Sequence, residues 1–138
     1  MIGWAVPAVV VVGALWWLRT GYVVVVVRGP SMRPTYRQGE RVLLRRTTAG
    51  NVQRGQVVVV TGVSDGGAWL LKRAVAIPGD PVPRDRVPAL RDVEGDTVPV
   101  GRLVLVGDNP DQSLDSRHFG YVAADRLVGV VVRRLSLR

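Results

Sequence analysis

The chain has 138 residues, which is enough for one ordinary domain core and leaves no room for a second catalytic domain. It contains no cysteine and one histidine, so a disulfide framework, a thiolate nucleophile and a cysteine zinc site are excluded, and little remains to bind a metal. The net charge of +8 indicates an anionic partner, but no basic helix or aromatic-interleaved basic patch is present, which argues against nucleic acid.

Residues 2–18 form an uncharged, apolar run that ends at a tryptophan pair, Trp16 and Trp17. Seventeen residues is about the minimum for a transmembrane helix, and tryptophans are common where such a helix meets the membrane surface. A cleaved secretory signal is the competing interpretation, but a basic start and a small-residue cleavage site are both missing. The sequence therefore predicts one uncleaved membrane anchor in residues 1–20.

Seven arginines and one acidic residue fall in residues 1–50, beside this apolar run. Each arginine near an anionic membrane surface contributes about 1 kcal/mol of attraction, so anionic lipid is the predicted partner of this region. Because Arg19 and Arg28 follow the run, the positive-inside rule would place the rest of the chain in the cytoplasm. That orientation conflicts with the function that the later motifs indicate.

Residues 21–138 are predicted to form a single, mostly β domain, because helix signals outside the anchor are scarce. Strands are expected where short runs rich in β-branched residues are bounded by glycine, proline or polar turns. These runs are residues 22–27, 40–44, 56–61, 69–76, 103–106 and 127–132. Residues 57–60 are all valine, which indicates burial on both faces, as in a compact barrel or folded-over sheet.

Residues 57–60 and 69–75 are expected to pair as a hairpin, because a strong turn, Ser64-Asp65-Gly66-Gly67, lies between them. Alternation along the second strand places Leu70, Lys72 and Ala74 on one face, among valine side chains. Residues 81–102 are rich in proline and arginine and have little periodicity, so they are predicted to be a short loop excursion.

Lys72 is the only lysine among 19 basic residues. Arginine stays protonated at any working pH, whereas a lysine among apolar neighbours can lose its proton and act as a base. Leu70, Leu71 and Val75 supply such neighbours. The alternative is that an arginine-rich composition retained one surface lysine by chance.

Two polar motifs offer partners for this lysine. Ser31 lies at a strand-to-turn junction stiffened by Pro30 and Pro34, although most such sequences are only turns. Residues 107–120 are the densest polar segment, which is also consistent with a hydrogen-bonded turn carrying an ordinary ion pair. A Ser-His-Asp triad would need His118, which is more typical of a loop residue, whereas a Ser/Lys pair is a recognised variant of the same chemistry.

Four separated blocks, taken together, resemble the type I signal peptidases, which include bacterial leader peptidases and mitochondrial inner-membrane proteases. They are residues 29–35, 54–58, 72–80 and 107–120, in the family's order and spread over residues 22–132. The first block alone is weak, but the ordered set is highly specific. The resemblance implies a compact, folded β-sheet or barrel domain behind one N-terminal transmembrane helix, with no cofactor and no metal.

The resemblance also implies a role for individual residues. Ser31 is the expected nucleophile, Lys72 the general base, and Ser113 the group that orients the lysine, with Asp108, Asp115 and Arg117 as supports. The backbone N–H of Ser31 is expected to be one oxyanion donor. An extended substrate is expected to run between two strands and to place small side chains in shallow pockets lined by Val27, Gly29, Met32, Tyr36, Leu70 and Leu71.

Four departures from the family pattern stand out. Gly29 replaces the serine that supplies a second oxyanion donor in some members, and Gln56 stands where an acidic residue is usual. The segment after Asp80 is short, so the second domain of larger members is reduced to the excursion. A basic N-terminal tail that would keep Met1 in the cytoplasm is also missing.

The sequence thus predicts a single-pass, membrane-anchored serine endopeptidase on the extracytoplasmic face of the cell membrane, which removes signal or leader peptides from exported precursors after small residues. One alternative is a dedicated maturation protease for a single precursor, carrying a peptide leader or a metalloenzyme pro-segment. From another class, the alternative is a basic membrane-surface binding module without catalysis. A self-cleaving repressor would share the Ser/Lys logic but would need a DNA-reading domain.

Overall fold

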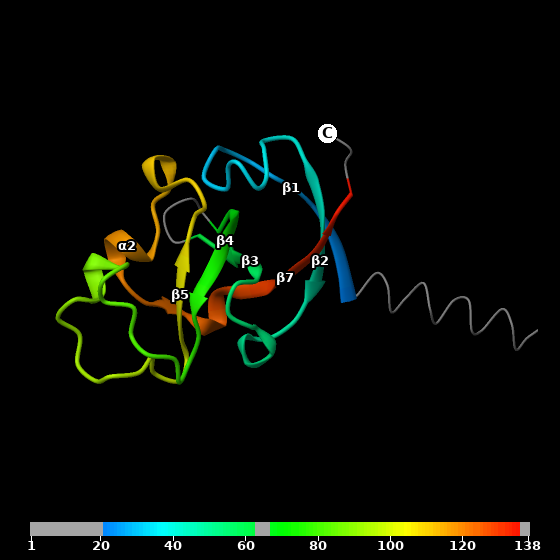
Figure 1. Ribbon diagram of the computed structural model, residues 1–138. Coiled ribbons are helices and arrows are strands. Elements are labelled where there is room, and N and C mark those ends of the chain that lie inside the picture. Colours follow the sequence, from blue (N-terminus) through cyan, green and yellow to red (C-terminus); the bar gives the residue numbers. More distant parts are fainter. Residues whose placement is uncertain (1–20, 63–66, 136–138) are drawn as a thin grey trace, which may run out of the picture.

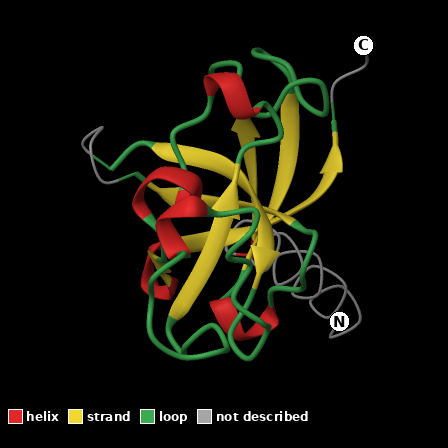
Figure 2. Cartoon of the chain, turned by 60° about the vertical axis from the view of Figure 1, so that its left-hand side comes forward, coloured by secondary structure: helices red, strands yellow, loops and turns green. Residues whose placement is uncertain are grey.

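A computed structural model describes residues 21–62 and 67–135 (Figure 1). Seven antiparallel strands form a curled half-barrel in the order β1-β2-β7-β3-β4-β5-β6 (Figure 2). The strands are β1 (Tyr22–Val26), β2 (Arg41–Arg46), β3 (Val57–Thr61), β4 (Trp69–Ala76), β5 (Arg102–Val106), β6 (Val122–Ala123) and β7 (Leu127–Arg134). The described helices are all short: α2 (Ser116–Phe119) and the 3-10 turns η1 (Ala49–Asn51), η2 (Pro88–Leu90), η3 (Pro110–Gln112) and η4 (Ala124–Arg126).

The six predicted strands are all present, and β4 has the predicted bounds, Trp69–Ala76. The mostly β fold class is therefore confirmed. Strand β6 was not predicted, because its two residues are too few to produce a periodic pattern. Helix α2, a single four-residue turn, was not predicted either.

The valine run of β3 is buried on both faces, as predicted. Val57 and Val59 belong to a first core cluster, which also holds side chains of β1 and β2. Val58 and Val60 belong to a second cluster with Leu103 and Leu105 of β5. Since the sheet curls around both sides of β3, the four valines are shielded from water, and polarity appears only at Thr61, the half-buried last residue of the strand.

The predicted hairpin of β3 and β4 is also confirmed. The two strands are antiparallel, with Val58 opposite Lys72 and Val60 opposite Leu70. Paired residues in adjacent strands point to the same face of a sheet. The side chain of Lys72 therefore shares its face with Val58, Val60 and Leu70, and this shared face is the origin of its apolar surroundings.

The excursion, residues 81–102, packs against the sheet and has a small core of its own. Val87, Leu90 and Val98 are buried against Ala76 of β4 and Val104 of β5. Its two sides are joined by backbone hydrogen bonds, from Val98 N to Asp80 O and from Val82 N to Asp96 O. The burial is irregularly spaced in sequence, so the segment lacked the periodicity that identifies strands and helices.

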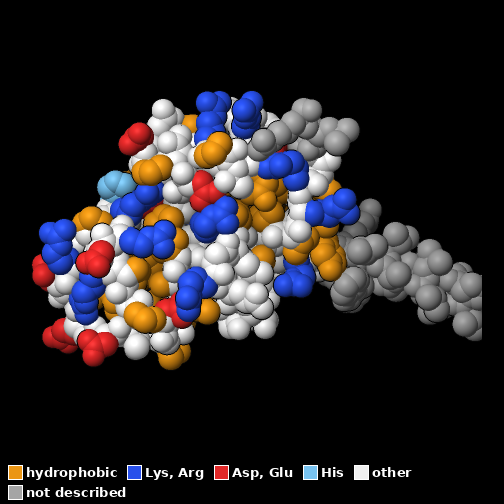
Figure 3. All heavy atoms as spheres, in the orientation of Figure 1, with side chains coloured by type: hydrophobic (Ala, Val, Ile, Leu, Met, Phe, Trp, Pro, Cys, Tyr) orange, Lys and Arg blue, Asp and Glu red, His pale blue; other side chains and the backbone are white. Residues whose placement is uncertain are grey.

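Charge is distributed unevenly over the surface. Basic side chains are spread over the face shown in Figure 3, whereas acidic ones gather mainly at the end formed by the excursion. Asp85, Asp92, Glu94 and Asp96 lie in that segment. The opposite end, at β1 and β2, carries Arg28, Arg41, Arg45 and Arg46.

The predicted membrane anchor, residues 1–20, lies outside the described part of the chain. Within residues 21–62 and 67–135, every helix is too short or too polar to cross a membrane. The described chain starts at Gly21, directly before β1, and β1 is an edge strand of the sheet.

Candidate active site

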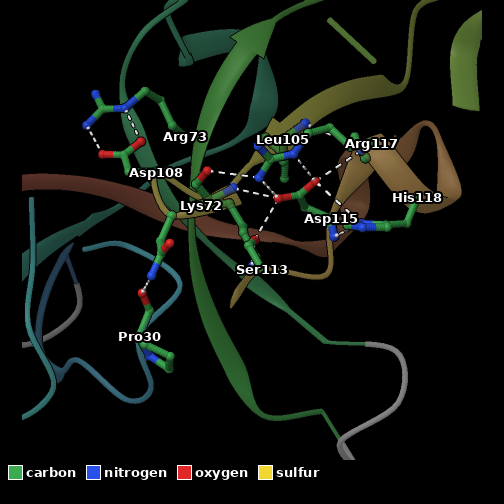
Figure 4. A network of polar contacts seen from close by, with 12 residues as sticks. Pro30, Lys72, Arg73, Leu105, Asp108, Ser113, Asp115, Arg117 and His118 are labelled. Carbon is green, nitrogen blue, oxygen red and sulfur yellow. Dashed lines mark hydrogen bonds and ion pairs between the residues drawn. The ribbon is translucent and has the colours of Figure 1, made fainter. Parts of the chain in front are cut away.

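Lys72 lies near the middle of β4, and 6% of its surface is exposed. Its Nζ donates a hydrogen bond to Ser113 Oγ at 2.9 Å (Figure 4). Burial lowers the pKa of Lys72; the Asp115 carboxylate nearby opposes this effect and the Arg117 guanidinium adds to it. The structure thus gives the lysine the desolvated surroundings that the sequence predicted, which favour a neutral amine able to accept a proton.

Asp115 anchors the group that touches the lysine. Ser113 Oγ donates to Asp115 Oδ2 at 2.6 Å, so the serine proton points at the carboxylate and an oxygen lone pair is left to accept from Lys72. The carboxylate also accepts from the backbone N–H of Gly107 at 2.8 Å and from Arg117 Nε at 2.9 Å. Burial alone would raise the pKa of Asp115, but hydrogen bonds from Arg117 and Ser113 outweigh it and hold the pKa well below its usual range.

The same aspartate begins helix α2. Asp115 is its N-cap: the side chain accepts from the backbone N–H of Arg117 at 3.0 Å, while His118 Nδ1 accepts from the backbone N–H of Asp115 at 3.2 Å. This reciprocal pattern is a capping box, and it explains why one helical turn forms here. Half of the His118 side chain is exposed, and within the described part of the chain its hydrogen bond is to Asp115.

A second ion pair joins β4 to the turn that carries Ser31. Arg73 donates to both oxygens of Asp108, from Nε at 2.8 Å and from Nη2 at 2.7 Å. Thr35 Oγ1, four residues after Ser31, donates to Oδ2 of the same carboxylate. The Arg73 hydrogen bond is the main reason that the pKa of Asp108 is lowered. Asp108 therefore fixes the Ser31 turn relative to the residue next to Lys72.

Residues 107–109 hold the Ser31 turn from the other side. Asn109 N donates to Ser31 O at 2.9 Å, and Asn109 Nδ2 donates to Pro30 O at 3.1 Å. Gly107 packs directly against the backbone of the Ser31 turn, because a Cβ atom placed on this glycine would be 2.6 Å from Ser31 O. Sequence analysis missed Thr35, Gly107 and Asn109 as site residues. These residues lie inside the two polar motifs, which is the one feature of the sequence that could have pointed to them. The atoms that they bind are known only from the fold.

Ser31 and Lys72 line the same pocket, whose volume is about 680 Å³. Apolar side chains form much of the remaining wall, including Leu70, Leu105 and Phe119. The pocket thus contains a serine hydroxyl, a buried amine and an apolar surface. Among the described residues, no group of three side chains is placed to hold a metal ion.

The six predicted substrate-binding residues fall in different surroundings. Leu70 lines the pocket. Val27, Met32 and Leu71 are buried in the first core cluster, with 2%, 1% and 6% of their surfaces exposed. Tyr36 packs against that cluster, and the Arg134 guanidinium lies over the tyrosine ring, 4.8 Å from the ring centre. Gly29, at the start of the turn, has φ +76. Their contact with substrate stays a prediction.

The family model described as "Signal peptidase, peptidase S26" matches residues 1–88 and 84–135. The chain belongs to the signal peptidase family. The chain is 34% identical over 111 residues to mitochondrial inner membrane protease subunit 1 of Schizosaccharomyces pombe, covering 78% of this chain and 69% of that protein. The subunit 1 of Mus musculus is 32% identical over 99 residues, 70% of this chain and 59% of the mouse protein. Signal peptidase I V of Bacillus subtilis is 28% identical over 137 residues, 76% of this chain and 80% of the relative.

Membership in the signal peptidase family confirms the resemblance carried by the four sequence blocks. The protein is a serine endopeptidase that processes leader peptides, and its substrates are precursors that carry them. A basic binding module without catalysis, the alternative from another class, is therefore not supported. Relatives of this signal peptidase act in the mitochondrial inner membrane, according to their names.

Replacing His118 with glutamine in this signal peptidase is expected to change cleavage less than about threefold, because the imidazole caps α2 and lies outside the reacting groups. Loss of a helix-capping contact costs about 1 kcal/mol of stability. The check is kcat/KM on a leader peptide together with the urea midpoint of unfolding. A loss of cleavage by a hundredfold in the folded variant would instead assign the histidine to catalysis.

Proposed function

We propose that this signal peptidase uses Ser31 as its nucleophile and Lys72 as its general base. The observation that carries the proposal is the burial of the single lysine at the pocket that Ser31 also lines. Burial lowers the pKa of Lys72, so this amine loses its proton at a lower pH than an exposed lysine and can then act as a base. The remaining polar groups of the site bind one another in a way that keeps these two in position.

In the first step, Lys72 Nζ removes the proton of Ser31 Oγ as the oxygen attacks the scissile carbonyl. The negative charge that develops on the carbonyl oxygen is stabilised by the backbone N–H of Ser31. When the tetrahedral intermediate breaks down, the ammonium of Lys72 returns the proton to the leaving amine. The products of this step are an ester on Ser31 and the released mature chain.

The second step repeats the same transfers with water. Lys72, neutral again, removes a proton from water as its oxygen attacks the ester, and then returns the proton to Ser31 Oγ. Ser113 keeps the amine oriented throughout, because its own proton is committed to Asp115. Arg117 keeps Asp115 ionised, so the carboxylate does not compete with Lys72 as a base.

We propose that residues 1–20 anchor the catalytic domain to the membrane, and we place the domain on the extracytoplasmic side because exported precursors are cut there, although the positive-inside rule favours the opposite side. Support for contact with the membrane, but not for its side, comes from the apolar run of the sequence and from the edge strand that follows it. Val24 and Val26 of β1 are 54% and 47% exposed. Arg28 follows β1 in the chain, and Arg41 of β2 lies opposite Val26 in the sheet. Apolar side chains flanked by arginine suit a surface of anionic lipid.

The test is cleavage of a precursor with an Ala-x-Ala site by the full chain in detergent, with the cut located by mass spectrometry. Wild type is expected to cut after the second alanine, and the Ser31→Ala variant is expected to leave the precursor intact. Ser113→Thr serves as a conservative comparison that keeps a hydroxyl. Cleavage by Ser31→Ala at the wild-type rate would exclude Ser31 as the nucleophile.

Should wild type leave the Ala-x-Ala precursor intact, a dedicated maturation protease becomes the better description. A library of leader peptides would then be screened, with Ser31→Ala as the background. Cleavage of a single member would assign the enzyme to one precursor.

A further inference from the structure

The pocket lining contains two chemically different groups of polar side chains. One group is Ser31, Lys72 and Asp115. The other group is Arg102 at the start of β5 and Arg126 at the end of η4, while Leu70, Leu105 and Phe119 contribute apolar wall. A pocket of about 680 Å³ is large for a site that admits only small side chains. The face of the substrate that meets this pocket therefore has room for a larger side chain.

The alternation of β4 indicates which side that is. Leu71 points to the first core cluster, whereas Leu70 and Lys72 point to the pocket. An extended substrate beside β4 alternates in the same way, because successive side chains in a strand leave opposite faces. If its small residues face the close-packed side with Leu71, the residue between them faces the pocket.

Arg102 and Arg126 are two positively charged side chains of the pocket lining. Within residues 21–62 and 67–135, neither guanidinium forms an ion pair with a carboxylate. Arg126 Nη1 donates to the backbone carbonyl of Thr61 at 3.5 Å, which places the side chain across the end of β3. A guanidinium carries five N–H donors, so most remain available to a ligand.

The acidic group of the pocket itself is already neutralised. Asp115 is bound by Arg117, Ser113 and the backbone of Gly107, and 1% of its surface is exposed. Among the described residues that line the pocket, Asp115 is the sole acid, so its charge is not available to offset Arg102 and Arg126 when a carboxylate enters. Arginine is also the side chain best suited to bind a carboxylate through two hydrogen bonds.

We propose that Arg102 and Arg126 make this pocket a specificity site for an acidic substrate side chain, on the face opposite the small residues and close to the scissile bond. The inference rests on the proposed Ser31/Lys72 function, which supplies the place where the substrate is cut. The preferred precursors would carry glutamate or aspartate at one of two positions. One is the x position of a small-x-small site, and the other is two residues before it, where an extended chain again faces the pocket.

The test compares peptides that differ only at these two positions, bearing Glu, Gln or Lys, with the full chain in detergent. Wild type is expected to cleave the best Glu peptide with a kcat/KM about tenfold above its Gln counterpart, as for a hydrogen bond to a charged group. The Arg102→Glu/Arg126→Glu variant is expected to prefer Lys over Glu. The preference of wild type should shrink as salt is added.

Arg86→Glu/Arg91→Glu is the matched control, because it makes the same change in net charge on exposed arginines of the excursion. This control should keep the wild-type preference for Glu. If the reversed variant unfolds, Arg102→Gln/Arg126→Gln is measured instead and should cleave Glu and Gln peptides equally.

Equal cleavage of Glu and Gln peptides by wild type would overturn the specificity proposal while leaving the catalytic one standing. An unchanged Glu preference in the arginine variants would overturn it as well. Failure of the catalytic proposal has a different signature, since Ser31→Ala would then still cleave these peptides.

Discussion

Lys72→Met is expected to reduce kcat/KM by about a thousandfold, within the range attributed to general acid–base catalysis, while the protein stays folded. Methionine has a similar length and fits the apolar surroundings provided by Val58 and Leu70, but it cannot accept a proton. Lys72→Arg should be as inactive, since a guanidinium stays protonated. The measurements are peptide cleavage and urea unfolding.

The pH dependence of wild type separates a base from a merely structural lysine. Because burial lowers the pKa of Lys72, kcat/KM is expected to rise with pH through an ionisation below the ordinary lysine value. Residual cleavage by Lys72→Met should lack this ionisation. A variant that keeps wild-type activity, or the same pH profile, would contradict the role of the lysine.

The free energy of unfolding should also depend on pH through the ionisation of Lys72, and the direction of this change can be predicted. The folded-state pKa of Lys72 lies below the unfolded value, so the unfolded chain binds more protons between the two. The stabilising contribution of this group is therefore complete above the unfolded pKa and is lost as the pH falls through the folded pKa. Relative to Lys72→Met, wild type is expected to gain stability as the pH rises across that window.

The strands were predictable because their signals are local. The valine run of β3 and the uninterrupted segment Trp69–Ala76 each carry enough β-branched or apolar residues to specify a strand without tertiary information. The order of the sheet was not predictable in this way. Strand β7 inserts between β2 and β3, and that arrangement depends on contacts between residues far apart in the chain.

The site was predictable in part for a similar reason. A single lysine in an apolar strand points to Lys72 because arginine cannot replace a neutral amine, and the structure brings it to Ser113, as the resemblance implied. Contacts made by backbone atoms leave no comparable trace in sequence. Asn109 binds the Ser31 turn through its own N–H and the serine carbonyl, and Gly107 matters because it lacks a side chain.

Gly107→Ala is expected to reduce kcat/KM by about a hundredfold, which is the cost of displacing reacting groups by roughly 1 Å. An alanine Cβ would lie 2.6 Å from both Ser31 O and Ser113 Cβ and closer still to Ser113 Oγ. No van der Waals contact is that short, so the Ser31 turn and the Ser113 side chain must move apart. Both attach to the groups that the reaction uses, the nucleophile and the amine that activates it.

The overpacking should also cost about 1–3 kcal/mol of stability, measured by urea unfolding. Gly50→Ala is the matched control, because a Cβ there meets nothing within 4 Å and should change neither property. The two effects are separable by measuring cleavage at a temperature where both variants are fully folded. Under those conditions Gly107→Ala should retain its loss in kcat/KM, since the displacement of Ser31 and Ser113 belongs to the folded state; recovery of wild-type cleavage there would mean that Gly107 supports only the fold.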